Sequence, residues 1–188
     1  FKRDNGEWVE QAKLTASDAE VNDQFGYSVS INEDYAIIGA YGNNLPAGIL
    51  VNSGSAYIFE KPDDGWSSNS GWMTETININ ASDAASNDYF GYSVSISGDY
   101  AVIGSTGNHT DGHGSAYIFK RNNGDWVEQD KLISHDASSG DWLGFSVSIS
   151  GDYAIIGAYR DSDNGTFSGS AYIFKKTKIP IIMLENIR

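Results

Sequence analysis

One loop near the C-terminal end of the sequence carries oxygen-bearing side chains at alternate positions. It reads Asp161-Ser162-Asp163-Asn164-Gly165. Calcium takes roughly six to eight oxygen ligands, and Asp-x-Asp spacing directs alternate side chains into one loop. We therefore predict that Asp161, Asp163 and Asn164 bind calcium. The alternative is an acidic turn that only faces solvent.

Three further pairs of aspartates recur at matching spacing. Aspartate in a turn commonly accepts a hydrogen bond from its own backbone. We expect this structural role, and the alternative is a calcium ion shared between neighbouring units. The pairs are Asp18 with Asp23, Asp83 with Asp88, and Asp136 with Asp141.

Aromatic side chains offer a second kind of chemistry, the stacking of a ligand. Tyr27, Tyr92 and Phe145 recur at one position of the sequence pattern, and Trp66 and Trp142 lie in or near loops. Aromatic rings beside a few polar groups are typical of ligand sites. We predict Tyr27, Tyr92 and Trp142 as binding residues. The alternative is that the recurring aromatic residues belong to the core.

Residues for covalent or acid–base catalysis do not stand out. The sequence has no Gly-x-Ser-x-Gly segment, and its serines recur at regular spacing. No pair of carboxylates departs from the periodic background, as a glycosidase would require. His109 and His113 flank a glycine-rich loop without a third metal ligand. We expect no catalytic residue and no enzymatic activity.

The charge of the chain limits its partners. The 188 residues include 12 basic and 25 acidic side chains, which gives a formal net charge of -13. Such a surface repels nucleic acid and anionic lipid. No apolar run approaches the roughly 20 residues of a membrane-spanning helix. We expect neither a nucleic-acid partner nor a membrane span.

The sequence repeats itself three times. Each copy has a Phe-Gly or Leu-Gly segment, an Asp-Tyr-Ala segment, and a Gly-Ser-Ala-Tyr-Ile-Phe segment. The first segment of the three copies begins at Phe25, Phe90 and Leu143. A fourth element, FKRDNGEWVEQAKL at 1–14, recurs almost unchanged as FKRNNGDWVEQDKL at 119–132, and residues 72–79 are a looser copy.

Each element has the pattern of a β-strand. Residues 25–31 alternate large apolar side chains with glycine and serine, which places the apolar ones on one face. Residues 35–40 are apolar on both faces, so both faces must be covered. The segment around Trp8 mixes charged and apolar residues, as a partly solvated edge strand does. Four such strands, covered on both sides by further copies, predict a β-propeller blade. A β-sandwich is the alternative.

These segments resemble the FG-GAP repeat. The features that carry the resemblance are the Phe-Gly start, the following Gly-Ala, and the Gly-Ser-Ala-Tyr-Ile-Phe strand, in three tandem copies over residues 1–176. The family builds the propeller head of integrin α-subunits and of many surface or secreted proteins. The resemblance implies four antiparallel strands per blade, and calcium in the loop before the Tyr-Ile-Phe strand. The proline of the Gly-Ala-Pro signature is replaced here by Tyr41, Thr106 and Tyr159.

We therefore predict an all-β chain made of three propeller repeats. Residues 1–14 supply the outer strand of a preceding or closing blade, 15–80, 81–134 and 135–176 form the repeats, and 177–188 match no repeat. Because known propellers have about four to eight blades, two interpretations stay open. The chain is part of a larger propeller, or copies of it assemble into a ring in which the Trp8 strand of one completes the Leu143 blade of another.

The expected function is a non-enzymatic interaction or adhesion module at the cell surface or outside the cell, stabilised by calcium, with a protein or glycan ligand. One alternative is a carbohydrate-binding propeller lectin. Another is the propeller region of a larger secreted enzyme.

Overall fold

The computed structural model describes residues 2–45, 49–66, 72–107 and 112–177. Within these ranges every regular element is a strand, and no helix is long and apolar enough to cross a membrane. The predicted segment 177–188 lies outside the described residues except for Thr177.

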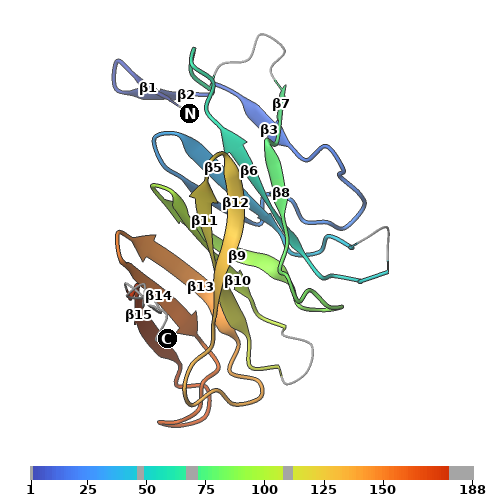
Figure 1. The fold of residues 1–188 in the computed structure, drawn as a ribbon, viewed down its shortest axis with the longest axis vertical. Coiled ribbons are helices and arrows are strands. Elements are labelled where there is room, and N and C mark those ends of the chain that lie inside the picture. The colour runs from blue at the N-terminus through green and yellow to red at the C-terminus, as the bar shows by residue number, and fades with distance from the viewer. Residues whose placement is uncertain (1, 46–48, 67–71, 108–111, 178–188) are drawn as a thin grey trace, which may run out of the picture.

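Three antiparallel sheets make up most of the structure (Figure 1). Sheet 1 has the order β4 (Ser28–Ile31), β5 (Tyr35–Ala40), β6 (Ser55–Glu60) and β8 (Ile77–Ile79). Sheet 2 has the order β9 (Phe90–Ser97), β10 (Tyr100–Ser105), β11 (Ser115–Asn122) and β12 (Asp125–Leu132). Sheet 3 has the order β13 (Leu143–Ser150), β14 (Tyr153–Ala158) and β15 (Ser170–Lys175).

The sheets lie face to face, with their first strands β4, β9 and β13 in contact from one sheet to the next. This is the arrangement of neighbouring propeller blades, and the prediction of an all-β chain with three blade repeats is confirmed. In the described ranges no strand pairs with the outer edge of β15, so sheet 3 has three strands.

The N-terminal residues form small elements of their own. Strands β1 (Lys2–Asp4) and β2 (Glu7–Val9) form a hairpin, and β3 (Lys13–Thr15) pairs in parallel with β7 (Trp72–Thr74). The hairpin has the register of the equivalent part of sheet 2. Arg3 lies opposite Trp8 in the hairpin, as Arg121 lies opposite Trp126 in sheet 2. The sequence likeness of 1–14 to 119–132 is thus also a likeness of backbone pairing.

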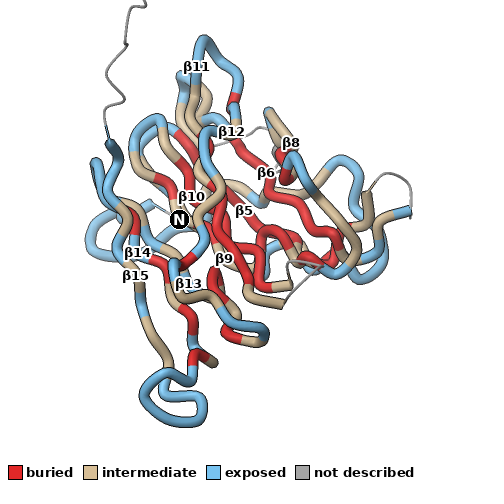
Figure 2. The backbone as a smooth tube through the Cα atoms, turned by 60° about the horizontal axis from the view of Figure 1, so that its bottom comes forward, coloured by how far each residue is buried: buried red, intermediate tan, exposed pale blue. Residues whose placement is uncertain are grey.

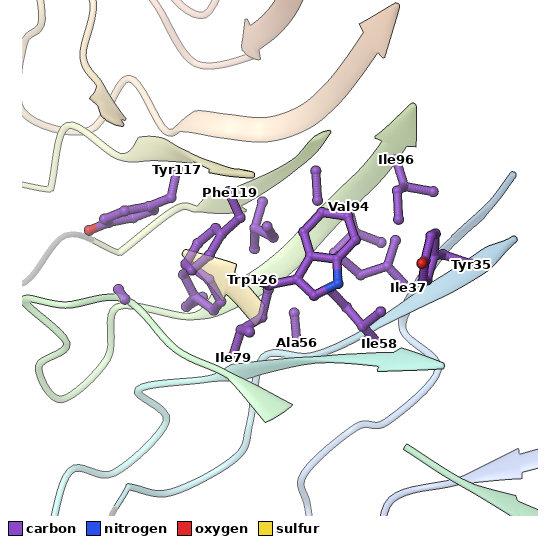
Figure 3. Packing of buried hydrophobic residues seen from close by; sticks show 14 residues of the cluster. Tyr35, Ile37, Ala56, Ile58, Ile79, Val94, Ile96, Tyr117, Phe119 and Trp126 are labelled. Carbon is purple, nitrogen blue, oxygen red and sulfur yellow. The ribbon is translucent and has the colours of Figure 1, made fainter. Parts of the chain in front are cut away.

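The main core fills the space between sheets 1 and 2. Figure 3 shows the Trp126 indole among side chains of both sheets. Strand β5 is buried along its whole length, as expected for a strand that is apolar on both faces. A second cluster joins sheets 2 and 3, and a third covers the other face of sheet 1 with Leu14, Phe25 and Trp66. In Figure 2 the buried chain runs through sheets 1 and 2, whereas β15 is partly exposed.

The Phe-Gly segments contain a β-bulge that simple alternation does not predict. In sheet 2 the register shifts between the pairs Ser105–Phe90 and Gly104–Ser93, so Gly91 and Tyr92 are extra residues on β9. Gly91 has φ 86°, a left-handed conformation that glycine adopts without strain. Because a bulge re-aims side chains, the tyrosine leaves the alternating row of Val94 and Ile96.

Candidate functional site

A row of aromatic rings crosses from sheet 1 to sheet 3 at the bulges. Tyr27 contacts Tyr92 with ring centroids 4.9 Å apart, and its hydroxyl donates to the Tyr92 hydroxyl at 2.9 Å. Tyr92 then contacts Phe145 at 5.2 Å, and Phe145 contacts Tyr159 at 4.2 Å. Tyr41 packs on Tyr27 at 4.5 Å and on Tyr92 at 5.4 Å. We call these five residues the aromatic row.

A hollow of about 480 Å³ lies beside this row, lined by residues from all three sheets and their loops. Aromatic rings supply most of its wall, and Asn87 and Thr106 add an amide and a hydroxyl group. The lining residues are Tyr41, Asn87, Tyr89, Tyr92, Thr106, Gly107 and Trp142. Flat apolar surfaces beside a few hydrogen-bonding groups suit the reversible binding of a small ring or side chain.

The loops hold the hollow's side chains through an unusual backbone. Asn87, Tyr89 and Trp142 have φ of 65°, 56° and 59°. Residues other than glycine seldom adopt this left-handed conformation, and bulky ones least of all. The loop aspartates close these turns, since Asp88 accepts the Ala85 N–H at 2.8 Å and Asp141 accepts the Ser138 N–H at 2.6 Å. Backbone strain that the surrounding structure holds in place is often found at binding sites.

The Tyr92 phenol is a neutral hydrogen-bonding group. Burial raises the pKa of Tyr92, and the hydrogen bond from Tyr27 raises it further. One positive charge stands at the edge of the row, where the Arg160 guanidinium lies 4.6 Å from the ring centre of Trp142 and 4.8 Å from that of Phe167. A cation over aromatic faces fixes the rings and adds a charged group to an otherwise neutral surface.

The structure brings the three predicted binding residues into one region. Tyr92 and Trp142 line the hollow, and Tyr27 joins it through its contact with Tyr92. Sequence reasoning did not single out Tyr41 and Tyr159 as site residues, although it identified both as departures from the Gly-Ala-Pro signature. That departure could have identified them as site residues, because two tyrosines replace a turn proline where the rings meet.

The predicted calcium loop is closed by hydrogen bonds of its own. Asp161 is buried, and its Oδ1 accepts the Asp163 N–H at 3.0 Å while Oδ2 accepts the Tyr172 hydroxyl at 2.8 Å. These bonds hold the pKa of Asp161 below its usual value, the Asp163 N–H contributing most. Asp163 and Asn164 are exposed. Each carboxylate oxygen has two lone pairs, so these three residues can supply part of a calcium shell, and the calcium role stays a prediction.

The aspartates before each repeat have structural partners. The Tyr57 hydroxyl donates to Asp18 at 2.9 Å, and the Tyr117 hydroxyl donates to Asp83 at 2.8 Å. Asp83 also accepts from Lys131 at 2.6 Å. Burial raises the pKa of Tyr117 to about 12, so this hydroxyl keeps its proton and its bond at neutral pH. Asp18 and Asp83 thus have a structural role through side chains distant in sequence, whereas the backbone bonds of the expected turn are made by Asp88 and Asp141.

The fold should lose stability in acid partly through Asp161. Its carboxylate has a lower pKa when folded, so it stabilises the fold above the pKa of the unfolded chain, and this contribution disappears as pH falls through the folded pKa. Asp161→Asn, which keeps an acceptor for the Asp163 N–H, should flatten the fall of the unfolding free energy between neutral and acid pH. Urea unfolding at a series of pH values measures this. The exposed Asp163→Asn is the control, and equal slopes for both variants would contradict the prediction.

These features define the class of protein: a propeller-type repeat fold whose loops carry an aromatic surface. The FG-GAP repeat matches residues 8–59, 73–119 and 126–174. The chain therefore belongs to the FG-GAP repeat family. Each matched unit runs from the tryptophan element through the Tyr-Ile-Phe strand that follows it. A comparison with curated proteins gives no match. FG-GAP repeats are typical of extracellular or surface proteins and suggest a propeller-type interaction module.

Proposed function

We propose that this chain is a non-enzymatic adhesion or recognition module, outside the cell or on its surface, that holds a ligand in the hollow beside the aromatic row. The supporting observation is the hollow itself. Four aromatic rings, an amide and a hydroxyl line it, and the left-handed loops at Tyr89 and Trp142 fix two of the rings. A protein ligand would place an apolar or aromatic side chain there.

Carbohydrate binding is the second candidate. Stacked rings next to Asn87 and Thr106 can receive the apolar face of a sugar ring and hydrogen-bond its hydroxyl groups. An array of immobilised oligosaccharides and an array of surface proteins, probed with the labelled chain, distinguish the two candidates. Binding to one class of array identifies the ligand class, and binding to neither removes both proposals.

Trp142→Ala is expected to weaken the binding found on either array by roughly tenfold or more, because tryptophan in a pocket is among the strongest contributors to interfaces. Val127→Ala is the control, because Val127 is an exposed apolar residue on strand β12 and does not line the hollow. Titration followed by calorimetry measures both dissociation constants. Equal affinities of the two variants would place the ligand site elsewhere.

Calcium stabilisation is a separate part of the proposal. Calcium that binds the folded loop raises the melting temperature, because a ligand of the native state stabilises it by mass action. We expect the increase in the wild-type chain, its loss with excess chelator, and its loss in Asp163→Asn. Asp34→Asn, which removes an exposed carboxylate of another loop, serves as control. A melting temperature indifferent to calcium and chelator removes the metal from the proposal.

A further inference from the structure

Neighbouring sheets are joined by a repeated set of hydrogen bonds between their first strands. Ser28 Oγ donates to the Gly91 carbonyl at 2.8 Å, and one sheet further on Ser93 Oγ donates to the Gly144 carbonyl at 2.7 Å. In the next rung Ser30 Oγ accepts the Ile96 N–H, and Ser95 Oγ accepts the Ile149 N–H, both at 3.2 Å. The interface between sheets 1 and 2 is thus repeated between sheets 2 and 3.

A glycine on the second strand makes room for each of these contacts. An added Cβ at Gly39 would lie 1.9 Å from the Gly91 carbonyl oxygen, and one at Gly104 would lie 2.0 Å from that of Gly144. Each glycine therefore forms a slot into which the next sheet inserts a carbonyl group.

Sheet 3 carries the same slot, and in the described residues no further sheet occupies it. Gly157 has the place of Gly39 and Gly104, and the three atoms nearest to a Cβ there all belong to Ser146, with Oγ the closest. Ser146 and Ser148, which correspond to Ser93 and Ser95, are exposed. A hollow of about 180 Å³ lies at this place, lined by Ser146, Ser148, Ile155 and Gly157 among others.

Apolar side chains on this face are left in solvent. Ile155 is 44% exposed and Ile173 is 71% exposed. Their equivalents in sheet 1, Ile37 and Ile58, are 0% and 1% exposed because sheet 2 covers them. We call the face formed by Ser146, Ser148, Ile155, Gly157 and Ile173 the open face of sheet 3.

Sheet 1 has the complementary face at the other end of the stack. Val29 and Ile31 are 67% and 64% exposed, whereas their equivalents Val94 and Ile96 are 7% and 6% exposed against sheet 1. Gly26 has nothing within 4 Å of an added Cβ, whereas a Cβ added to its equivalent Gly91 would lie 2.3 Å from the Ser55 carbonyl oxygen. The first strand of sheet 1, β4, therefore has the shape that enters such a slot. No sheet in the described residues offers a slot to this strand.

We propose that the open face of sheet 3 binds residues 25–31 of a second copy of this chain, head to tail. The register of the two existing interfaces predicts the contacts. Ser146 Oγ donates to the Gly26 carbonyl of the second copy, Ser148 Oγ accepts its Ile31 N–H, and Val29 and Ile31 cover Ile155 and Ile173. This proposal does not depend on the ligand of the aromatic hollow.

The exposure of Trp8 also supports a contact with a second copy. Trp126 is 7% exposed and packs on Tyr35 at 5.7 Å, whereas Trp8 is 70% exposed. Tyr100, the equivalent of Tyr35, carries Lys176 over its ring at 4.3 Å and borders a hollow of about 340 Å³. Trp8 of the second copy reaches this hollow when β2 leaves β1 and pairs with β15, as β12 pairs with β11.

Head-to-tail contacts of this kind are heterologous, and they close into a ring when the rotation between copies permits. Two copies in which both ends engage bring together twice the three sheets of one chain, a number within the range of about four to eight blades in known propellers. The expected assembly is therefore a closed dimer.

Sedimentation of the 188-residue chain over a range of concentrations tests the proposal. We expect a concentration-dependent dimer whose dissociation constant rises at least tenfold in Gly157→Ala, because the added methyl group fills the slot. Ile31→Glu should have the same effect from the other face. Val127→Glu, an exposed apolar residue on the outer strand β12, should leave the dimer intact. Circular dichroism and the melting temperature verify that each variant folds.

Mixing the two interface variants gives a stricter test. Gly157→Ala retains an intact sheet 1 face, and Ile31→Glu retains an intact open face, so each alone should be monomeric while their mixture forms a one-to-one heterodimer in native mass spectrometry. A wild-type chain that is monomeric throughout overturns the proposal, and so does a dimer insensitive to both variants. If residues 178–188 occupy the open face instead, the chain is a monomer and associates only after truncation at Thr177. This result also overturns the proposal.

Discussion

Gly104→Ala is expected to destabilise the fold by about 3 kcal/mol, because it forces a methyl group into a closed interface. The new Cβ would lie 2.0 Å from the Gly144 carbonyl oxygen and 2.3 Å from Ser93 Oγ. The serine can rotate, but the carbonyl belongs to the inner strand of sheet 3 and moves only if the sheets separate. Its bond from Ser93 Oγ, 2.7 Å long, is lost in the process.

The same substitution at Gly157 is the matched control. Its Cβ would approach Ser146 Oγ at 2.4 Å and meet nothing else closer than 3.7 Å. Rotation of one exposed serine relieves this contact, so the dilute chain should unfold at nearly the wild-type urea concentration. Urea unfolding followed by circular dichroism compares the two variants. Similar losses of unfolding free energy in both variants would mean that the glycine is required by its own strand and not by contact with the neighbouring sheet.

The repeating parts of the fold could be predicted from sequence because each copy contains strands that are apolar on both faces. Residues 35–40 and 55–59 are apolar without alternation, and a strand of that kind needs a sheet on either side. The structure places β5 and β6 in the interior accordingly. The outer strand was also predictable, since Trp126 and its neighbours recur around Trp8 with the same backbone register.

Other parts depend on geometry that a strand pattern does not contain. Alternation places Tyr92 beside Val94 and Ile96, but the bulge at Gly91 turns it toward the rings of Tyr27 and Phe145. The parallel pairing of β3 with β7 joins residues far apart in sequence, and neither strand carries a signal for it.

The sequence predicted which residues belong to the candidate site better than it predicted how they are arranged in space. Tyr92 and Trp142 were named because of their place in the repeat and in a loop, and they line one hollow. Their meeting depends on left-handed φ at Trp142 and on the bulge of β9, and a one-dimensional pattern shows neither. For Asp161 the sequence indicated an oxygen donor, but not that the Tyr172 hydroxyl and the Asp163 N–H both bond to it.

Phe90→Ala should have the largest effect of any single truncation in the inner strands, a loss of about 4 kcal/mol of unfolding free energy. Phe90 is 0% exposed and contacts the rings of Tyr117 at 5.4 Å and Phe119 at 6.0 Å. Sheet 1 closes over these rings, so the cavity left by the phenyl group cannot fill by a small movement of one sheet. The cost of such a cavity grows with its volume.

Phe25→Ala shows how much of the stability at this position comes from a neighbouring sheet that covers the ring, and how much comes from contacts within one sheet. Phe25 meets Tyr57 at 5.4 Å and Phe59 at 6.2 Å, nearly the same distances as around Phe90, but it is only partly buried. In the dilute chain its truncation should therefore cost clearly less than that of Phe90. Urea unfolding at low and high protein concentration measures both, and the two costs should converge where a second copy covers sheet 1. Equal costs in the dilute chain would show that the stability at this position comes from within each sheet.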